Sequence, residues 1–365
     1  MVVGGSVAAL SGGDGASTAP DPATPAGTSA TNPAFSYGNE VFYDGPARSA
    51  TIDDTAVKSL FYTSAGVLVR HGDNAWSDGG GPQRFSLVDA DGDVHRLGLE
   101  TEETVHAADP AQPYVVYGEA VDGQLDVVVY DVEADEEAAR VEVAPTEDSW
   151  FPVSLDGDTL YVQNGYDGGS FAVDWRTGDV TDWEYGEVWE VAGGHAGITL
   201  DSGTAVIDAA TGEVLLQSGA RGYFDLSPDG RYAQLVDEEA RGPAKFEVYD
   251  VASTSSVEIP GQPFEWGWSA DGDLFQVTKD QVRTCSPVTG ECTVEPYAQP
   301  AIPQPPAVTQ TMRDPVCPAD NQDCFMDEGF LENCAENPDQ CEWQETEYVE
   351  EQTIELKLGG RAYES

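Results

Sequence analysis

Short runs of alternating apolar and polar residues recur along most of the chain, and similar turn residues separate them. Each run is rich in Val, Ile, Phe and Tyr and ends at an Asp, with Gly or an equivalent turn residue three or four positions later. Alternation with a period of two predicts β-strands, and Asp with Thr-Gly predicts a tight hairpin turn. The residues at the Asp position, spaced 34 to 43 apart, are Asp89, Asp131, Asp174, Asp208, Asp250 and Ser286.

A second turn signature, Ser-x-Asp-Gly, alternates with the first. It occupies residues 154–157, 227–230 and 269–272, and a decayed copy lies at 108–111. A strand-like run follows these turns, so each unit of about forty residues carries two hairpins. Four strands per unit, with no helical period between units, predict an all-β chain folded as a β-propeller. A β-sandwich also has short strands, but it has no reason to repeat the same turn residues at a fixed interval.

The number of blades depends on the two ends of the repeat region. Six full four-stranded repeats fit within about 56–298, and residues 40–52 form one more hairpin of the same kind. This hairpin lacks its first two strands, which the strand-like second half of residues 347–358 could supply. The sequence therefore predicts six full repeats with either an added hairpin or a seventh blade closed by the two termini.

Composition divides the remaining chain into segments. We expect residues 1–10 to be the remnant of a signal or membrane anchor, so that an N-terminal tether is lost from this chain. Residues 11–35 have the composition of a disordered linker. The propeller is expected over 36–298, a Pro-rich linker over 299–316, and an acidic, Cys-stapled tail over 317–365.

The turn motifs resemble those of TolB-like and WD40-like β-propellers, particularly exported ones of high-GC actinobacteria. The resemblance rests on Ser-Pro-Asp-Gly at 227–230 and on Asp-x-x-Thr-Gly at 174–178 and 208–212. It covers roughly residues 36–298, and the hairpin from Cys285 to Cys292 is similar to a disulfide-closed last blade of such proteins. The resemblance implies an exported propeller and specifies no activity.

The charge balance narrows the choice of partners. The 365 residues include 67 Asp and Glu but only 16 Lys and Arg, which gives a net charge of −51. Nucleic-acid binding depends on clustered Lys and Arg, which this chain lacks, and an anionic membrane surface would repel it. No stretch reaches the roughly 18 apolar residues that a membrane-spanning helix needs.

The six cysteines form three local pairs, each separated by seven positions. An even number of Cys in local pairs favours disulfides and an oxidising compartment. Structural zinc sites usually have two to four residues between paired Cys, whereas each of these pairs has six. The expected disulfide partners are Cys285 with Cys292, Cys317 with Cys324, and Cys334 with Cys341.

No motif for catalysis or metal binding stands out. The four His are isolated in the sequence, and it contains no Gly-x-Ser-x-Gly or His-x-x-x-His pattern. Asp89, Asp91 and Asp93 resemble the start of a calcium loop, but a strand-like run follows them, which favours a solvated hairpin turn. We therefore assign no catalytic residue, metal ligand or cofactor.

Aromatic residues recur where the innermost strands are expected to begin, and acidic residues lie beside them. In a propeller these positions ring one mouth of the central channel. Such aromatics either fill the wedge between blades or line an acidic cup for a sugar or a cationic peptide. The candidate ligand-binding residues are Trp150, Trp189, Tyr223, Trp266, Glu147, Asp148 and Glu265.

These observations predict a binding protein more readily than an enzyme. The leading hypothesis is a monomeric, non-enzymatic β-propeller, secreted or held at the cell surface, that presents a binding face to a protein or an envelope polymer. The alternative is a secreted hydrolase or lyase that uses paired carboxylates at the mouth of the channel. Two carboxylates close together in a deep axial pocket would favour the enzyme.

Overall fold

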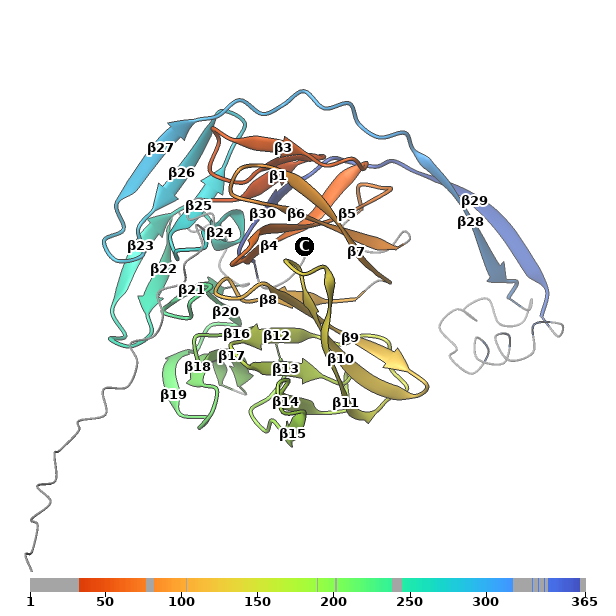
Figure 1. Cartoon of the computed structure of the whole chain (residues 1–365), viewed down its shortest axis with the longest axis horizontal. Coiled ribbons are helices and arrows are strands. Elements are labelled where there is room, and N and C mark those ends of the chain that lie inside the picture. Colours follow the sequence, from red (N-terminus) through yellow and green to blue (C-terminus); the bar gives the residue numbers. More distant parts are fainter. Residues whose placement is uncertain are drawn as a thin grey trace, which may run out of the picture.

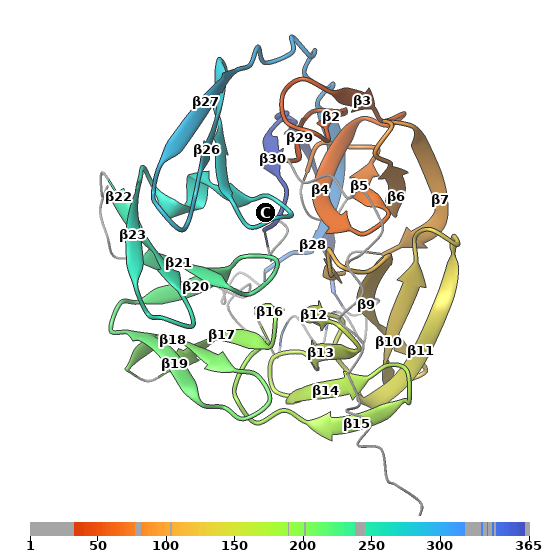
Figure 2. The same cartoon turned by 60° about the vertical axis from the view of Figure 1, so that its left-hand side comes forward.

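The computed structural model describes residues 33–76, 82–102, 104–188, 190–200, 202–237, 245–317 and 341–361, together with Phe330, Cys334 and Pro338. Over these residues, seven four-stranded antiparallel sheets form a ring around a central channel (Figures 1 and 2). None of the described helices is long and apolar enough to cross a membrane.

Six blades are each built from four consecutive strands, and the first strand of each lies innermost (Figure 2). Blade 1 contains β4 (Ala56–Thr63), β5 (Gly66–Gly72), β6 (Gln83–Val88) and β7 (Val94–Thr101). Blade 2 contains β8 (His106–Ala108), β9 (Tyr114–Val121), β10 (Gln124–Asp131) and β11 (Glu136–Pro145). Blade 3 contains β12 (Val153–Asp156), β13 (Thr159–Gln163), β14 (Ser170–Asp174) and β15 (Asp179–Asp182).

The next three blades follow the same order. Blade 4 contains β16 (Glu190–Ala192), β17 (His195–Leu200), β18 (Gly203–Asp208) and β19 (Val214–Ser218). Blade 5 contains β20 (Gly222–Leu226), β21 (Tyr232–Asp237), β22 (Lys245–Asp250) and β23 (Ser256–Pro260). Blade 6 follows the 3-10 turn η1 (Pro263–Glu265) and contains β24 (Gly267–Trp268), β25 (Leu274–Val277), β26 (Gln281–Cys285) and β27 (Cys292–Pro296).

Blade 7 joins both ends of the propeller. Its order from the channel outward is β30 (Leu356–Leu358), β1 (Phe35–Tyr37), β2 (Glu40–Phe42) and β3 (Ser49–Thr51). Phe35 lies opposite Leu358 across the closing pair and stacks on Phe42 with ring centroids 4.6 Å apart. The prediction of a seventh blade closed by the two termini is therefore confirmed.

Four expectations about the segments of the chain differ from the structure. The C-terminal segment supplies only the innermost strand of blade 7, because β1 already provides the second strand. Strand β1 begins at Phe35, within the segment expected to be a linker, and β30 lies in the segment expected to be a separate tail. The expected Pro-rich linker also contains a strand, β28 (Val308–Pro315), which pairs with β29 (Trp343–Glu350). Strand pairing between distant segments was not readable from local composition.

Strands β28 and β29 form a two-stranded arm that projects from the ring (Figure 1). The base of the arm is fixed to blade 1, because the side chain of Gln352 accepts a hydrogen bond from the Ala75 amide (2.7 Å) and donates one to the Pro306 carbonyl (2.9 Å). Ile354 is buried in a small cluster with Ala56 and Ala75. The arm leads directly into the inner strand β30.

The repeated turns form by the local chemistry that the sequence predicts. The carboxylate of Asp174 accepts hydrogen bonds from the amides of residues 176 and 177, at 3.0 and 2.9 Å, and Gly178 has a φ of +78°. Two copies lack this glycine, and there Asp135 and Thr254 adopt φ values of +56° and +58°. The turn geometry is thus retained even where a side chain raises its conformational cost.

The apolar core lies between neighbouring blades. One cluster joins Leu68 and Phe85 of blade 1 to Val115 and Val128 of blade 2. Another joins Phe246 of blade 5 to residues of blade 6. Because both faces of each sheet are covered by a neighbouring blade, the inner edges of the sheets line the channel.

Candidate functional site

The channel has one end at which all inner strands begin. In every blade the four strands are antiparallel, so the outermost strand ends at the level where the next inner strand starts. We call this end the entrance mouth. The loops between the second and third strands of blades 2, 3 and 6, the turn η1 and the base of the arm reach it.

Four described aromatic side chains occur at the entrance mouth. Trp150 is half-buried ahead of β12 and stacks on Tyr166 with ring centroids 5.0 Å apart and planes inclined by 20°. Tyr166 lies between β13 and β14 and is 79% exposed. Tyr223 in β20 is 45% exposed, and Phe264 in η1 is 60% exposed. Exposed rings are therefore spread over blades 3, 5 and 6.

Exposed carboxylates accompany these rings. Glu147 and Asp148 lie shortly before Trp150, and the Asp148 carboxylate packs against Gly165, the residue before Tyr166. Glu265 follows Phe264 and accepts a hydrogen bond from the side-chain amide of Gln276 at 2.8 Å. The mouth thus combines aromatic faces with negative charge.

One of the predicted aromatics does not contribute as expected, and another is not described. Trp266 is fully buried and packs with Phe246 and Trp268 between blades 5 and 6, so it fills the wedge and offers no surface to a ligand. Trp189 lies outside the described residues. Phe264 supplies the exposed ring at blade 6, because Pro263 begins a 3-10 turn that displaces the chain before β24. That proline was the available signal in the sequence.

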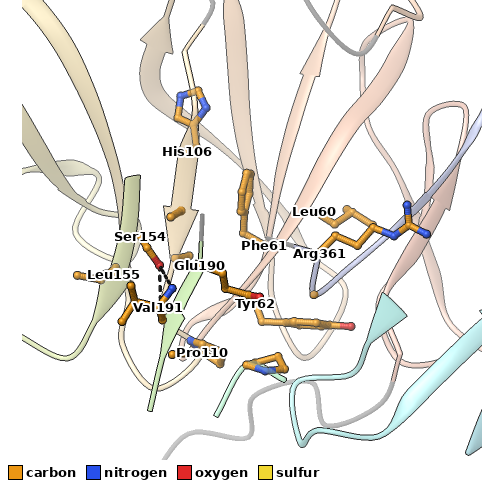
Figure 3. A pocket seen from close by; sticks show the side chains of 15 residues that line it. Leu60, Phe61, Tyr62, His106, Pro110, Ser154, Leu155, Glu190, Val191 and Arg361 are labelled. Atoms are coloured by element: carbon orange, nitrogen blue, oxygen red, sulfur yellow. Dashed lines mark hydrogen bonds between the residues drawn. The ribbon is translucent and has the colours of Figure 1, made fainter. Parts of the chain in front are cut away.

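A small cavity lies inside the channel, between the inner strands of several blades. It has about 80 Å³ of space for water-sized molecules, enough for a few waters and less than a drug-sized ligand occupies. Side chains from β4, β8, β12, β16 and the segment after β30 surround it (Figure 3). The residues labelled there include Tyr62, His106, Ser154, Glu190 and Arg361.

Side chains of one blade satisfy the inner edge of the next. The Ser154 hydroxyl accepts a hydrogen bond from the Val191 amide (3.0 Å) and donates one to the Val191 carbonyl (2.9 Å), as Figure 3 shows. Glu190 acts similarly one blade further on, where its carboxylate accepts a hydrogen bond from the Leu226 amide at 2.5 Å. These contacts cover backbone groups that an unpaired inner edge would leave exposed.

Glu190 and Asp225 form a pair of interacting carboxylates on neighbouring inner strands. Burial raises the pKa of Glu190 well above its usual range, and the charge of Asp225 raises it further. Burial also raises the pKa of Asp225 to about 6, although Arg361 and hydrogen bonds from Gln234 and Trp268 oppose the rise. The pair therefore holds a proton at pH values at which isolated carboxyl groups would be ionised.

Arg361 brings a cation into the same part of the channel. Its guanidinium donates hydrogen bonds to the carbonyl oxygens of Phe264 and Trp266, the second at 3.3 Å. Burial lowers the pKa of Arg361, while the charges of Asp225 and Tyr223 oppose that change. No local motif in the sequence identifies Asp225 or Arg361 as part of a site.

A buried Asp-His-Ser network lies in blade 1. His71 is 2.9 Å from Asp54 through Nδ1 and 2.9 Å from the hydroxyl of Ser86 through Nε2. The arrangement resembles a hydrolytic triad, but His71 and Ser86 are 1% and 2% exposed. Burial lowers the pKa of His71, and the nearby positive charge of Arg96 lowers it further. A neutral His71 inside the blade ties the Asp54 loop to β5 and β6.

The turn at Asp89 has the geometry of a hairpin turn. One carboxylate oxygen accepts hydrogen bonds from the amides of Asp91, Gly92 and Asp93, at 2.9 to 3.0 Å. The other oxygen lies 3.1 Å from Nε2 of His95, and this interaction lowers the pKa of Asp89. Among the described residues, no group of three or more His, Cys, Asp or Glu side chains could hold a metal ion.

Two of the expected disulfides are present among the described residues. Cys285 is bonded to Cys292 across the β26–β27 hairpin, and Cys334 is bonded to Cys341 at the tip of the arm. Cys317 is also disulfide-bonded, but Cys324 lies outside the described residues. The Cys285–Cys292 bond cross-links β26 and β27, the two outer strands of blade 6.

Comparison with known proteins finds similarity in structure but none in sequence. No family model matches the sequence, and no curated protein matches it. TolB from Acinetobacter baumannii aligns with a TM-score of 0.42 and 10% identity over 64% of this chain and 65% of TolB. PorZ, a surface component of the type-IX secretion system of Porphyromonas gingivalis, aligns at 0.45 and 14%, over 75% of this chain and 38% of PorZ.

In a third structure the alignment covers nearly the whole of the other chain. Apo AztD from Citrobacter koseri aligns with a TM-score of 0.39 and 12% identity, over 73% of this chain and 95% of AztD. At these values the function of those proteins is not transferable. The sheet topology itself decides the fold: over the described residues, seven antiparallel blades, closed by strands from both ends of the ring, form a β-propeller.

Proposed function

We propose that this protein is a non-enzymatic binding module that works outside the cell and captures a cationic segment of a partner protein at its entrance mouth. The observation that carries the proposal is the group of exposed rings, Trp150 with Tyr166, Tyr223 and Phe264, beside exposed carboxylates. A sugar or envelope polymer could use the same rings, but the acidic neighbours favour a cationic ligand.

The physical basis is the combination of ring faces with negative charge. A Lys or Arg side chain over an aromatic face gains about 0.5–2 kcal/mol, with the larger values where water is excluded. Nearby Asp and Glu add Coulombic attraction, and a net charge of −51 steers cations toward the molecule at low ionic strength. A basic peptide that contacts several rings would accumulate these contributions.

The disulfides support a location outside the cytoplasm. The structure contains the disulfides Cys285–Cys292 and Cys334–Cys341. Disulfides persist in oxidising compartments and are rare in reducing ones. Attachment through the N-terminal segment and export from an actinobacterial cell remain part of the proposal, because residues 1–32 lie outside the described structure. We propose that the protein acts there as a monomer.

A secreted hydrolase or lyase is the second candidate, and the Glu190–Asp225 pair favours it. Paired carboxylates whose pKa values are raised and coupled suit general acid and base catalysis. The adjoining cavity of about 80 Å³ has room for only a few waters. The Glu190 carboxylate already accepts a hydrogen bond from the Leu226 amide. The exposed mouth therefore supports binding better than the channel supports catalysis.

The test is a binding measurement on the secreted protein with three peptides of equal length: basic, neutral and acidic. We expect the basic peptide to bind, and binding to weaken steeply between 50 and 300 mM NaCl. Trp150→Ala and Tyr223→Ala should each weaken binding about 2-fold to 30-fold, the range that corresponds to the loss of one cation–π contact.

Tyr348→Ala is the matched control, because Tyr348 is 47% exposed but lies on the projecting strand β29. Equal binding of all three peptides, or equal effects of the mouth and arm substitutions, would contradict the proposal. Hydrolysis of an envelope polymer that Glu190→Gln abolishes would instead support the second candidate.

A further inference from the structure

The segment after β30 turns into the channel through two glycines. The Gly359 amide donates a hydrogen bond to the Ala34 carbonyl at 2.8 Å, which holds this point against the start of blade 7. Gly360 has a φ of +67°, and a Cβ there would collide with the carbonyl oxygen of Trp268. The chain therefore passes closely against β24, and this route directs Arg361 inward.

The acceptors that receive Arg361 are fixed in place. The carbonyl of Phe264 belongs to η1, and the carbonyl of Trp266 belongs to a residue whose side chain is fully buried between two blades. Both oxygens are bound by the same guanidinium nitrogen. This nitrogen, Nη2, carries two N–H bonds in the fixed plane of the guanidinium, so two rigid acceptors set the orientation of an arginine, whereas the ammonium of a lysine rotates freely.

The charge of Arg361 is also matched by its surroundings. The guanidinium interacts electrostatically with Asp225, which in turn interacts with Glu190. Removal of Arg361 would leave two neighbouring carboxylates without this cation in a partly dehydrated channel, which is unfavourable. A displacing group with a positive charge of its own would preserve this compensation.

The same place adjoins the exposed mouth. Phe264, whose carbonyl binds Arg361, has an exposed ring, and Tyr223, whose hydroxyl interacts electrostatically with Arg361, is exposed as well. A peptide that lies on these rings is thus next to the acceptors that hold Arg361. The internal arginine occupies the innermost part of the acidic, aromatic entrance mouth described above.

We propose that the channel contains a guanidinium-binding site that Arg361 occupies within the chain and that an arginine of the partner protein takes in its place. This inference rests on the proposed function, and it specifies arginine as the anchoring residue of the partner. It also assigns Arg361 a competitive role, because the partner must displace it. An internal competitor has a high effective concentration and lowers the apparent affinity for the partner.

The experiment compares the full chain with Arg361→Ala, using N-acetyl-arginine amide and N-acetyl-lysine amide as probes. Arg361→Ala should melt at a lower temperature than the native chain, and millimolar arginine amide should restore at least half of the difference. The lysine amide at equal ionic strength should restore much less, and neither probe should change the melting of the native chain. Ligand-induced stabilisation of this kind follows from binding to the folded state alone.

The second measurement uses a basic peptide with a single arginine and a matched peptide in which lysine replaces it. Arg361→Ala should bind the arginine peptide at least 10-fold more tightly than the native chain does, and the lysine peptide should show a smaller gain. Asp225→Asn combined with Arg361→Ala should lose most of the gain. Arg361→Gln, which retains donors without the charge, provides the same comparison if the alanine variant folds poorly.

Unchanged affinity in both Arg361 variants, or equal rescue by the two amides, would overturn the inference. The amide rescue does not depend on Trp150 or Tyr166, so it can succeed even if the mouth captures no basic protein. Conversely, peptide binding that depends on Trp150 but is indifferent to Arg361 would retain the proposed function and reject the guanidinium site.

Discussion

The carboxylate of Asp225 on β20 accepts a hydrogen bond from the indole N–H of Trp268 on β24, with 3.2 Å between the two heavy atoms. The side-chain amide of Gln234 donates to the same carboxylate oxygen. Asp225 is only 8% exposed, and Glu190 and Arg361 are the charged groups that interact with it. Asp225 therefore links blades 5 and 6 at the centre of the propeller.

The first prediction concerns the effect of pH on stability through Asp225. Its folded-state pKa of about 6 lies above the ordinary value of 3.8, so its contribution to stability is present below about pH 4 and is lost as the pH rises through 6. Asp225→Asn cannot ionise. From pH 4 to pH 7.5, the unfolding free energy of this variant should gain about 2–3 kcal/mol relative to the native chain.

Urea denaturation at several pH values measures this difference. The raised pKa of Glu190 makes the unfolding free energy depend on pH in the same direction as Asp225 does. The contributions of His71 and Asp54 to the pH dependence cancel in the comparison, because both proteins contain these residues. Asp167→Asn, which changes an exposed carboxylate in the β13–β14 loop, is the control and should show no comparable dependence on pH. Parallel curves for Asp225→Asn and the native chain would show that burial does not raise the pKa of Asp225.

The second prediction concerns the buried triad-like network of blade 1. Ser86 is 2% exposed, so a serine-directed fluorophosphonate should not label it in the folded protein. Ser86→Ala should cost about 1–3 kcal/mol of unfolding free energy, because Nε2 of His71 loses the nearer of its two partners, at 2.9 Å, and keeps only Arg96, at 3.2 Å. Peptide mapping after exposure to the reagent and urea denaturation provide the two measurements. Stoichiometric labelling of Ser86 would mean that the network is a nucleophilic site.

The repeat architecture was predictable because its turns are local. Asp174 and Gly178 supply a hydrogen-bond acceptor and a positive φ within five residues, so the sequence alone identifies the turn. The hairpin at 40–52 indicated a seventh blade by the same logic. The inner strand of that blade, β30, pairs with β1 from more than 300 residues away in sequence, so only the composition of residues 347–358 pointed to the closure.

The channel was much less predictable than the turns. Arg361 meets Phe264 across 97 positions, and Glu190 meets Leu226 across 36. Neither contact has a local signature, because each depends on how one inner strand faces the next. The aromatic positions show the same limit: Phe264 and Trp266 are two residues apart, yet one ring is exposed and the other is fully buried.

The third prediction compares how much two disulfides, Cys285–Cys292 and Cys334–Cys341, contribute to the stability of the propeller. Each joins cysteines seven positions apart, but only Cys285–Cys292 lies within a blade, where Cys285 is buried against the core that contains Trp266 and Trp268. Replacing both of these cysteines by Ser should lower the unfolding free energy of the propeller by about 2–3 kcal/mol, the value expected for a loop of this length. Tryptophan fluorescence during urea denaturation reports this unfolding.

The matched control is the double Ser replacement of Cys334 and Cys341 at the tip of the arm. This pair closes a loop of the same length outside the ring, so the propeller transition should change by less than about 0.5 kcal/mol. Similar losses in the two double variants would indicate that the tip contributes to the stability of the blades. Non-reducing peptide mapping of the native chain checks the pairing itself.

The last prediction concerns the closure of the ring by β30. Lys357 lies opposite Ser36 of β1, and β30 is the only strand that covers the inner edge of β1 among the described residues. Lys357→Pro removes a backbone donor from this strand and should lower the unfolding free energy by about 3 kcal/mol or more. Glu351→Pro is the matched control, because Glu351 is exposed and lies between β29 and β30, outside any strand. It should change the unfolding free energy by less than about 1 kcal/mol.

Hydrogen exchange separates the two variants further. In Lys357→Pro the amides of β1 and β2 should lose protection before those of β9 and β10, which lie in blade 2, away from the closure. Equal protection throughout the ring would mean that blade 7 remains closed without the β30 pairing.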